Sequence, residues 1–341
     1  MRRLIYIFII GLLLCSYTWA DGSRYASKSL LSEGKWVKIR VDKTGIYKLS
    51  YADLKNMGFS DPSKVSVHGY GGWPLDEDFS KEYIDDVPST PVWRGSDYLL
   101  FYGKGPVKWE YDSSSQTFVH TNNPYSLYGY YFVTDATPTN DMTSVAQASG
   151  ATNRITTYDD YLVHEQELVS LAKSGRELYG EDFSGATPRT LSTFSSIPGI
   201  TNEDAKVTMS FVSKVTSGTG VASLSINQSN VLDVSIRSNR EEYVKALEGV
   251  STAVWKGEKS EKNSVVVSYN SASHNNVRLN YVRLHFKRTL QPYGAYTFFR
   301  SIASIGNVSR FVVQGANANT LVFDVTDAQR VRLMETELNG S

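Results

Sequence analysis

The fold is decided by residues 34–72, which read GKWVKIRVDKTGIYKLSYADLKNMGFSDPSKVSVHGYGG. Apolar and charged residues alternate over 37–41, which is the period-2 pattern of a half-buried strand. The alternation resumes over 46–49, after turn residues at 42–45. We therefore expect these two strands to form a hairpin, with Gly45 at positive φ in its turn.

A short helix follows the second of these strands. Ser50 is suited to cap its first turn, and Asp53 places an acid three residues later, as in a capping box. Leu54 and Met57 give the helix a small apolar stripe, and Gly58 ends it at positive φ. The stretch therefore predicts a β-rich module with one short helix.

Short β-strand patterns continue through the rest of the chain, whose 22 tyrosines and 14 phenylalanines suit pleated sheets. Residues 97–103 form an apolar run typical of a central strand, and 112–115 are turn residues of a hairpin between 109–111 and 117–120. The later runs predict an antiparallel β-sandwich or jelly-roll-like domain, because turn residues separate most of them. The other predicted strands are residues 128–134, 207–215, 221–226, 231–236, 264–269, 277–286, 296–299, 311–313 and 321–325. The state of residues 239–249 stays open.

The N-terminus predicts export. Arg2 and Arg3 precede an apolar run, and Ala20 is a small residue suited to cleavage. We expect a cleaved signal peptide, and an uncleaved membrane anchor is the alternative. The predicted segments are a signal peptide (1–20), a leader (21–33), an N-terminal β-rich domain (34–150), a connecting segment (151–184) and a β-sandwich domain (185–341), which we expect to be truncated before a catalytic domain.

Composition excludes several functions. The chain has 35 basic and 35 acidic residues, so it lacks the positive charge that nucleic-acid binding requires. The only cysteine, Cys15, lies within the predicted signal peptide. The mature chain is therefore expected to have neither a disulfide nor a cysteine nucleophile, and its stability must come from a buried core.

Signatures of catalysis and metal binding are incomplete. His164 begins a zincin-like pattern, but Leu168 stands where the second histidine is needed. Gly218 and Gly220 are followed by Ser223 instead of a third dinucleotide-binding glycine. We therefore assign no catalytic, cofactor-binding or metal-binding residue and expect no cofactor.

An acidic loop at 76–86 leaves one question open. Asp76, Asp78, Asp85 and Asp86 supply the hard oxygen ligands that calcium favours, although their spacing matches no EF-hand. The alternative is a solvated acidic surface.

Residues 174–183, SGRELYGEDF, combine an arginine with several carboxylates. A general acid–base pair is one interpretation. We favour a structural clamp in which Arg176 binds Glu177 or Glu181 at a bend between domains.

An ordered series of motifs resembles the N-terminal region of the PorU-type sortases, the C-terminal signal peptidases of the bacterial type IX secretion system. The motifs are VDKTGIYKLSYADLKNMGF (41–59), VHGYGG (67–72), DYLLFYGKGP (97–106), NPYSLYGYYFVT (123–134), SGRELYGEDF (174–183) and FDVTD (323–327). The resemblance implies a non-catalytic β-rich region that precedes a gingipain-like cysteine-peptidase domain. The catalytic Cys and His of that domain would lie beyond Ser341.

The same resemblance implies the function of the full-length protein. It would remove the C-terminal sorting domain of secreted cargo and attach the cargo to anionic lipopolysaccharide at the cell surface. The implied partners are a PorV-like outer-membrane β-barrel shuttle protein, other attachment-complex proteins and the cargo, and the implied location is the outer-membrane surface. The alternative is a free-standing secreted β-sandwich protein for adhesion or carbohydrate binding.

Overall fold

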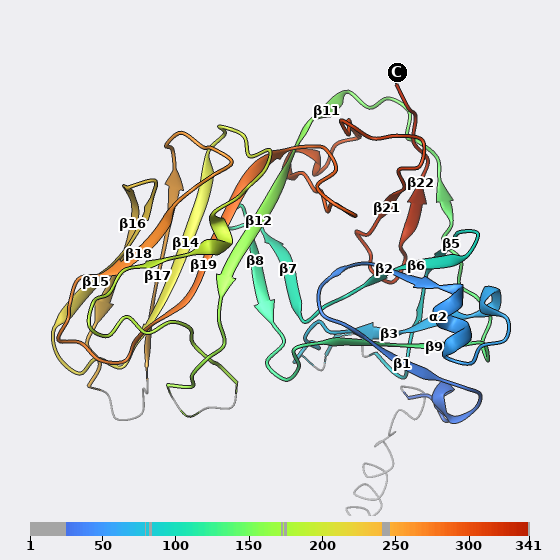
Figure 1. Ribbon diagram of the computed structural model, residues 1–341, viewed down its shortest axis with the longest axis horizontal. Helices are drawn as coiled ribbons and strands as arrows, with labels where there is room; N and C mark the ends of the chain where they lie inside the picture. Colours follow the sequence, from blue (N-terminus) through green and yellow to red (C-terminus); the bar gives the residue numbers. More distant parts are fainter. Residues whose placement is uncertain are drawn as a thin grey trace, which may run out of the picture. The chain divides into compact units, whose positions relative to one another are not determined.

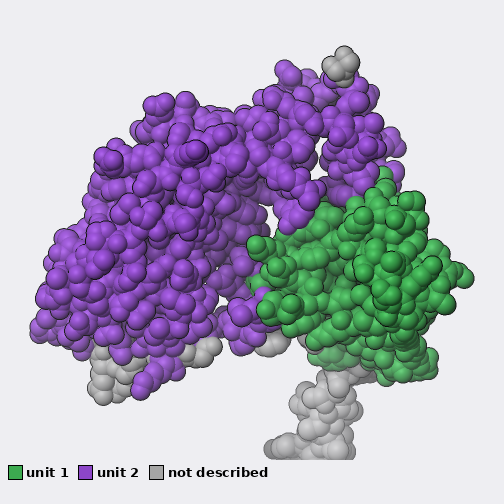
Figure 2. All heavy atoms as spheres, viewed as in Figure 1, with its two compact units in different colours: residues 1–106, 128–143, 324–333 green, residues 107–127, 144–323, 334–341 purple. Residues whose placement is uncertain are grey.

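The computed structural model describes residues 25–78, 80–81, 84–171, 173, 176–240 and 246–339 (Figure 1). The predicted signal peptide lies outside these residues. The chain forms two compact units, coloured separately in Figure 2. The first comprises residues 1–106, 128–143 and 324–333, and the second 107–127, 144–323 and 334–341.

The fold is mainly β, as predicted. In the described part of the chain α2 (Tyr51–Asn56) is the one α-helix, and no helix is long and apolar enough to cross a membrane. Ser50 caps α2 as expected, because its Oγ accepts a hydrogen bond from the backbone N of Asp53 at 3.0 Å. The 3₁₀-helices are η2 (Leu30–Ser32), η3 (Pro62–Lys64), η4 (Ser192–Phe194) and η5 (Ile302–Ser304).

Two antiparallel sheets build the first unit. One has the order β1-β9-β3-β4, with β1 (Val37–Val41), β9 (Gly129–Thr134), β3 (Ser66–Gly71) and β4 (Ser89–Thr90). The other has the order β2-β6-β5, with β2 (Gly45–Ser50), β6 (Tyr98–Gly103) and β5 (Val92–Arg94). β6 is central, as its apolar run predicted. The core contains Val41, Leu54, Phe59, Val65, Val67, Val92, Leu99, Phe101, Tyr131 and Val133.

The predicted hairpin of residues 37–49 is wrong, because β1 pairs with β9 whereas β2 pairs with β6. The turn between them is closed by a side chain: the Tyr47 hydroxyl accepts from the backbone N of Lys43 at 3.2 Å and donates to its carbonyl at 2.8 Å. Gly45 opens β2 opposite Gly103 and is not among the described glycines with left-handed φ, so that prediction is also wrong. Gly58 has φ 88°, as expected.

Three glycines of the first unit form a close backbone crossing, which we call the glycine junction: Gly72, Gly105 and Gly129. The backbone N of Gly72 donates to the carbonyl of Lys104 at 2.8 Å. A Cβ on Gly129 would lie 2.3 Å from that carbonyl oxygen and 2.7 Å from the N of Gly72, and a Cβ on Gly105 would lie 2.4 Å from the carbonyl carbon of Lys43. The motifs GYGG, GKGP and LYGYY therefore meet where backbones touch without side chains between them.

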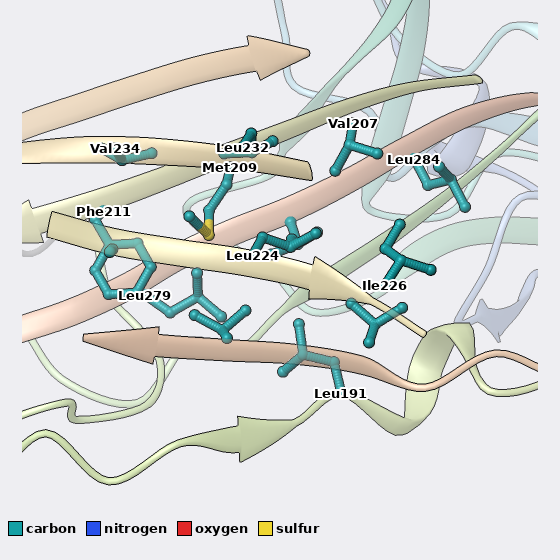
Figure 3. Packing of buried hydrophobic residues seen from close by; sticks show 14 of the residues in the cluster. Leu191, Val207, Met209, Phe211, Leu224, Ile226, Leu232, Val234, Leu279 and Leu284 are labelled. Carbon is teal, nitrogen blue, oxygen red and sulfur yellow. The ribbon is translucent and has the colours of Figure 1, made fainter. Parts of the chain in front are cut away.

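The second unit is the predicted antiparallel sandwich (Figure 1). The larger sheet has the order β12-β19-β14-β17, with β12 (Thr157–Glu165), β19 (Val277–Thr289), β14 (Ala205–Ser213) and β17 (Leu247–Trp255). The smaller sheet has the order β13-β18-β15-β16, with β13 (Arg189–Thr190), β18 (Val265–Tyr269), β15 (Thr219–Ile226) and β16 (Ser229–Arg237). Buried side chains from both sheets interdigitate in the core, including Val207, Met209, Phe211, Leu224, Val234 and Leu279 (Figure 3).

The remaining strands are short or stand apart from these sheets. β7 (Val107–Asp112) and β8 (Thr117–Asn122) form the predicted hairpin. β11 (Asn153–Ile155) pairs in parallel with β20 (Ser309–Phe311). A small sheet has the order β10-β22-β21, with β10 (Ser144–Val145), β22 (Arg332–Met334) and β21 (Val322–Asp324).

The structure corrects two expectations for the second unit and decides part of a stretch that was left open. β12 lies within the stretch that we expected to connect two domains, and its charged residues conceal its strand pattern in the sequence. Residues 296–299 lie outside any strand, which makes that strand prediction wrong. Residues 247–255, partly inside the undecided stretch 239–249, form β17, and residues 241–245 lie outside the described residues.

Candidate functional site

A connected group of hydrogen-bonded polar side chains in the second unit lies under the β7–β8 hairpin. The hairpin packs on the face of the larger sheet that points away from the sandwich core: Trp109 stacks on Tyr161 with ring centroids 3.8 Å apart, and Phe118 meets His285 edge-on at 5.4 Å. Around these rings lie side chains that we call the polar layer: Thr117, His120, Asp159, Glu165, Arg283, His285 and Lys287.

One row of the polar layer has the order hydroxyl, imidazole and carboxylate. Thr117 Oγ1 lies 3.1 Å from Nδ1 of His285, and His285 Nε2 lies 3.1 Å from Oδ1 of Asp159. This is the order of groups in a hydrolytic triad. Thr117 is only 4% exposed, however, and both partners are also buried. Because a substrate cannot reach the hydroxyl, we assign the row to folding and not to catalysis.

Asp159 connects several segments of the second unit. Its carboxylate also accepts hydrogen bonds from Lys287 Nζ at 2.9 Å and from the backbone N of Ile302 at 2.7 Å, and its own N donates to the carbonyl of Arg300 at 2.9 Å. Burial alone would raise the pKa of Asp159, but the hydrogen bonds from His285, Lys287 and Ile302 outweigh it, and the pKa is lowered. The residue is therefore a buried carboxylate whose charge is compensated.

A second row of the polar layer defines the tautomer of His120. Arg283 Nη1 lies 3.3 Å from His120 Nδ1, and because a guanidinium only donates, Nδ1 accepts. His120 Nε2 then carries a proton and donates to Glu165 Oε2 at 2.8 Å. Strand β8 is thus joined by hydrogen bonds to β19 and β12.

The other three histidines also have hydrogen-bond partners. His164 contacts Glu181 at 2.7 Å and Thr193 at 2.9 Å. His68 contacts Thr137 at 2.8 Å and His274 contacts Tyr269 at 2.5 Å. Over the described ranges, no three His, Cys, Asp or Glu side chains are grouped so that they could hold a metal ion.

The clamp predicted for Arg176 with Glu177 or Glu181 stays a prediction. Arg176 is exposed, and the carboxylate of Glu181 contacts His164. The mostly buried guanidinium of Arg278 donates to Asp182 at 3.3 Å and to the carbonyl of Gly180 at 3.0 Å. The segment 174–183 thus takes part in one arginine–carboxylate pair whose arginine, Arg278, belongs to β19.

The acidic loop at 76–86 contacts the leader. Asp86 accepts hydrogen bonds from Ser29 Oγ at 2.7 Å and from the backbone N of Leu30 at 2.5 Å, and Asp85 accepts one from the backbone N of Ala26. Asp76 forms an ion pair with Lys81 at 2.7 Å. Part of the predicted leader is therefore held by two of the carboxylates considered as calcium ligands, Asp85 and Asp86.

The sequence reasoning missed the polar layer. Its signal was the alternation of Asp159, Tyr161 and Glu165 along one strand, combined with the aromatic residues Trp109 and Phe118 on a neighbouring hairpin. That pattern indicates a sheet face covered by another element, although it does not identify which strand lies below which.

Comparison with known proteins includes a strong similarity to a solved structure. No protein-family model and no curated protein matches the chain. The crystal structure of dimeric latent PorU from Porphyromonas gingivalis superposes with a TM-score of 0.84 and 32% sequence identity, covering 93% of this chain and 30% of that one. The chain therefore spans less than a third of the length of that relative.

Two further structures are far less similar. A Listeria monocytogenes protein in complex with glucose, magnesium and calcium has a TM-score of 0.25 and 8% identity, covering 74% of this chain and 19% of that one. The Clostridium thermocellum xylanase 10B in complex with xylohexaose has a TM-score of 0.22 and 12% identity, covering 43% of this chain and 28% of that one. Neither value indicates a shared arrangement of the whole chain.

Proposed function

Because this chain is a PorU-type N-terminal region, we propose that it is the non-catalytic front part of a type IX secretion system sortase. The observation that carries the proposal is the similarity to PorU over 93% of this chain at a TM-score of 0.84. Since the chain spans 30% of PorU, we propose that it is part of a longer protein, which we call the parent protein. The catalytic residues of the parent protein would lie outside this chain.

The geometry supports a scaffold better than a reaction centre. The hydroxyl–imidazole–carboxylate row is closed to substrate, and its groups hold the β7–β8 hairpin to the sandwich. His120 and His164 also bridge neighbouring segments through carboxylates. We propose that these rigid units position a gingipain-like cysteine-peptidase domain.

The proposed activity of the parent protein is removal of the C-terminal sorting domain of secreted cargo and attachment of the cargo to anionic lipopolysaccharide. The proposed partners are a PorV-like shuttle barrel and other attachment-complex proteins. Export by the predicted signal peptide and residence at the outer-membrane surface belong to the same proposal.

A chimera tests this function. Residues 25–339 replace the matching region of Porphyromonas gingivalis PorU in a cell that lacks PorU, and processing of a cargo with its sorting domain is followed by immunoblot. A control chimera carries an unrelated β-sandwich of similar size. We expect the first chimera to restore cargo processing and the control to leave the sorting domain attached.

Two results would contradict the proposal. One is an exported, protease-resistant chimera that leaves cargo unprocessed as fully as the control does. The other is tight binding of the purified chain to a defined glycan, combined with failure of the chimera, which would favour the free-standing adhesion or carbohydrate-binding protein.

A further inference from the structure

Strand β1 is an outer strand of the first unit, beside β9, and its free edge is open (Figure 1). It pairs with β9 through all five of its residues in unbroken register, so it has no bulge. Among the described residues, no backbone hydrogen bond joins residues 37–41 to a segment other than β9. The backbone groups that point away from a sheet at such an edge can pair with another polypeptide.

The other outer strands of this unit are short, covered or interrupted. β4 has two residues. The edge of β5 is covered, because the backbone N of Val92 donates to the carbonyl of Asn140 at 2.8 Å and the N of Met142 donates to the carbonyl of Val92 at 2.8 Å. β2 runs directly into α2, and the Asp53 carboxylate accepts a hydrogen bond from Ser50, its last residue, at 2.6 Å. An acidic strand would therefore meet a carboxylate at the end of β2.

The two faces of β1 differ in chemistry. Val37, Ile39 and Val41 point to the core of the unit, and the first two are only half-buried against it. Lys38 and Arg40, which we call the cationic pair, are exposed on the opposite face. A strand added at the free edge would therefore have apolar neighbours on one face and two positive charges on the other.

The cationic pair lies over the neighbouring strand and not over the free edge. Lys38 Nζ is 3.9 Å from the centroid of the Tyr130 ring, and Tyr130 belongs to β9. The guanidinium of Arg40 is 4.3 Å from the centroid of the Tyr128 ring, just before β9. Charged side chains often protect a sheet edge from pairing. Here they are held on aromatic rings to one side, so the backbone groups of the edge stay accessible.

The positive charge of this region is not neutralised by carboxylates. Residues 37–50 contain four basic residues and one acidic residue, Asp42, which accepts a hydrogen bond from the Tyr47 hydroxyl at 3.0 Å. In the described part of the chain, no carboxylate forms an ion pair with Lys38 or Arg40. An aromatic ring attracts a cation but leaves its charge in place. The edge therefore favours an acidic strand and disfavours a basic one, because like charges on neighbouring strands destabilise a sheet.

We propose that the free edge of β1 binds an extended acidic segment of a partner protein by strand addition. Side chains of the added strand alternate between the faces, with acidic residues opposite Lys38 and Arg40 and apolar residues beside Val37 and Ile39. Residues on one face of a strand are about 6.8 Å apart in both strands, so one acidic–apolar–acidic run matches the whole cationic pair.

Fluorescence anisotropy of the full chain with a labelled peptide tests the proposal. The probe is Thr-Glu-Val-Glu-Val-Glu-Thr. One comparison peptide has the same composition with its three glutamates adjacent, and another keeps the sequence but carries N-methyl groups along its backbone. We expect saturable binding of the probe and binding weaker by at least about tenfold for both comparison peptides, because the first loses the alternation and the second loses the ladder.

Charge reversal tests the location. The double variant Lys38→Glu with Arg40→Glu should bind the probe at least about tenfold more weakly. The matched control is Lys48→Glu, because Lys48 Nζ likewise lies 4.0 Å from the centroid of a tyrosine ring, Tyr98, but on the sheet of β2. It should bind within about twofold of the parent. A peptide with lysines in place of the glutamates should bind the double variant and not the parent, which also shows that the double variant is folded.

Four results overturn the proposal. The parent fails to bind the probe, or Lys48→Glu weakens binding as much as the double variant does. Alternatively, the rearranged or methylated peptide binds as tightly as the probe. Finally, dextran sulfate binds the parent more tightly than the probe and is weakened equally by the double variant, which identifies a general polyanion surface.

Discussion

Gly129→Ala should destabilise the first unit strongly, although Gly129 is not among the residues with positive φ. The new methyl group would lie 2.3 Å from the Lys104 carbonyl oxygen, 2.7 Å from the backbone N of Gly72 and 2.8 Å from Cγ2 of Val41. Ordinary contacts begin about 1 Å farther out, and two of these atoms are backbone, so no rotamer change relieves the overlap. The Gly72–Lys104 hydrogen bond of 2.8 Å must lengthen or break.

Overpacking costs about 1–3 kcal/mol, and one lost backbone hydrogen bond adds about 1 kcal/mol, so we expect a loss of roughly 2–4 kcal/mol in the free energy of unfolding. For a unit of this size that lowers the melting temperature by about 10 °C.

Gly58→Ala in the same unit is the control. Gly58 has φ 88°, but its Cβ would meet only the flexible end of Lys35, so backbone strain of about 1–2 kcal/mol is the whole expected cost. Calorimetry of both variants and the parent measures the difference. If Gly129→Ala melts within 2 °C of the parent, or no lower than Gly58→Ala, the glycine junction is not the tight crossing described.

The remaining predictions concern the second unit and the whole chain. Asp159→Ala should lower the free energy of unfolding, measured in urea, by about 3–5 kcal/mol, because it leaves the Lys287 ammonium without this carboxylate partner. An unchanged urea midpoint would contradict this. The pKa values of Asp159 and Glu181 are lowered in the folded protein: burial alone would raise both, but their hydrogen bonds outweigh it. As pH falls below about 4, the unfolded chain binds more protons than the folded protein does at these two carboxyl groups. The stability that the two ionised groups contribute is therefore present above that pH and is lost below it. Thermal melts from pH 7 to pH 3 should show this loss, with a shallower slope in Asp159→Asn. The purified chain alone should leave cargo with its sorting domain intact, since its only cysteine is Cys15, and inhibitor-sensitive cleavage by a homogeneous sample would refute this.

Local chemistry was predictable where a single segment contains its own signals. The cap at Ser50, the αL glycine at position 58 and the β7–β8 hairpin all follow from residues within one turn of each other. The partner of a strand was not predictable in the same way. Alternation showed that β1 and β2 each bury one face, but only the folded chain shows that they join different sheets.

The polar layer was harder to predict for a physical reason. β12 presents Asp159 and Glu165 on a face that is buried under another element, so charges that normally indicate solvent here indicate a covered polar contact. β17 was missed for the opposite reason, because small residues on its inner face give a weak hydrophobic signal. The histidines could be dismissed as a metal site by spacing, but their carboxylate partners lie up to 126 residues away in the sequence.

The division of the chain into units has a consequence for the order in which structure appears during synthesis. The first unit takes a segment from residues 324–333, and the second takes its hairpin from residues 107–127, between two parts of the first. Neither unit can therefore complete its contacts while the N-terminal third alone has left the ribosome. Strand pairs such as β1 with β9 must also wait for about ninety intervening residues, and such distant pairing slows folding. The first unit therefore stays incomplete, with unpaired backbone groups, until residues 324–333 have been synthesised.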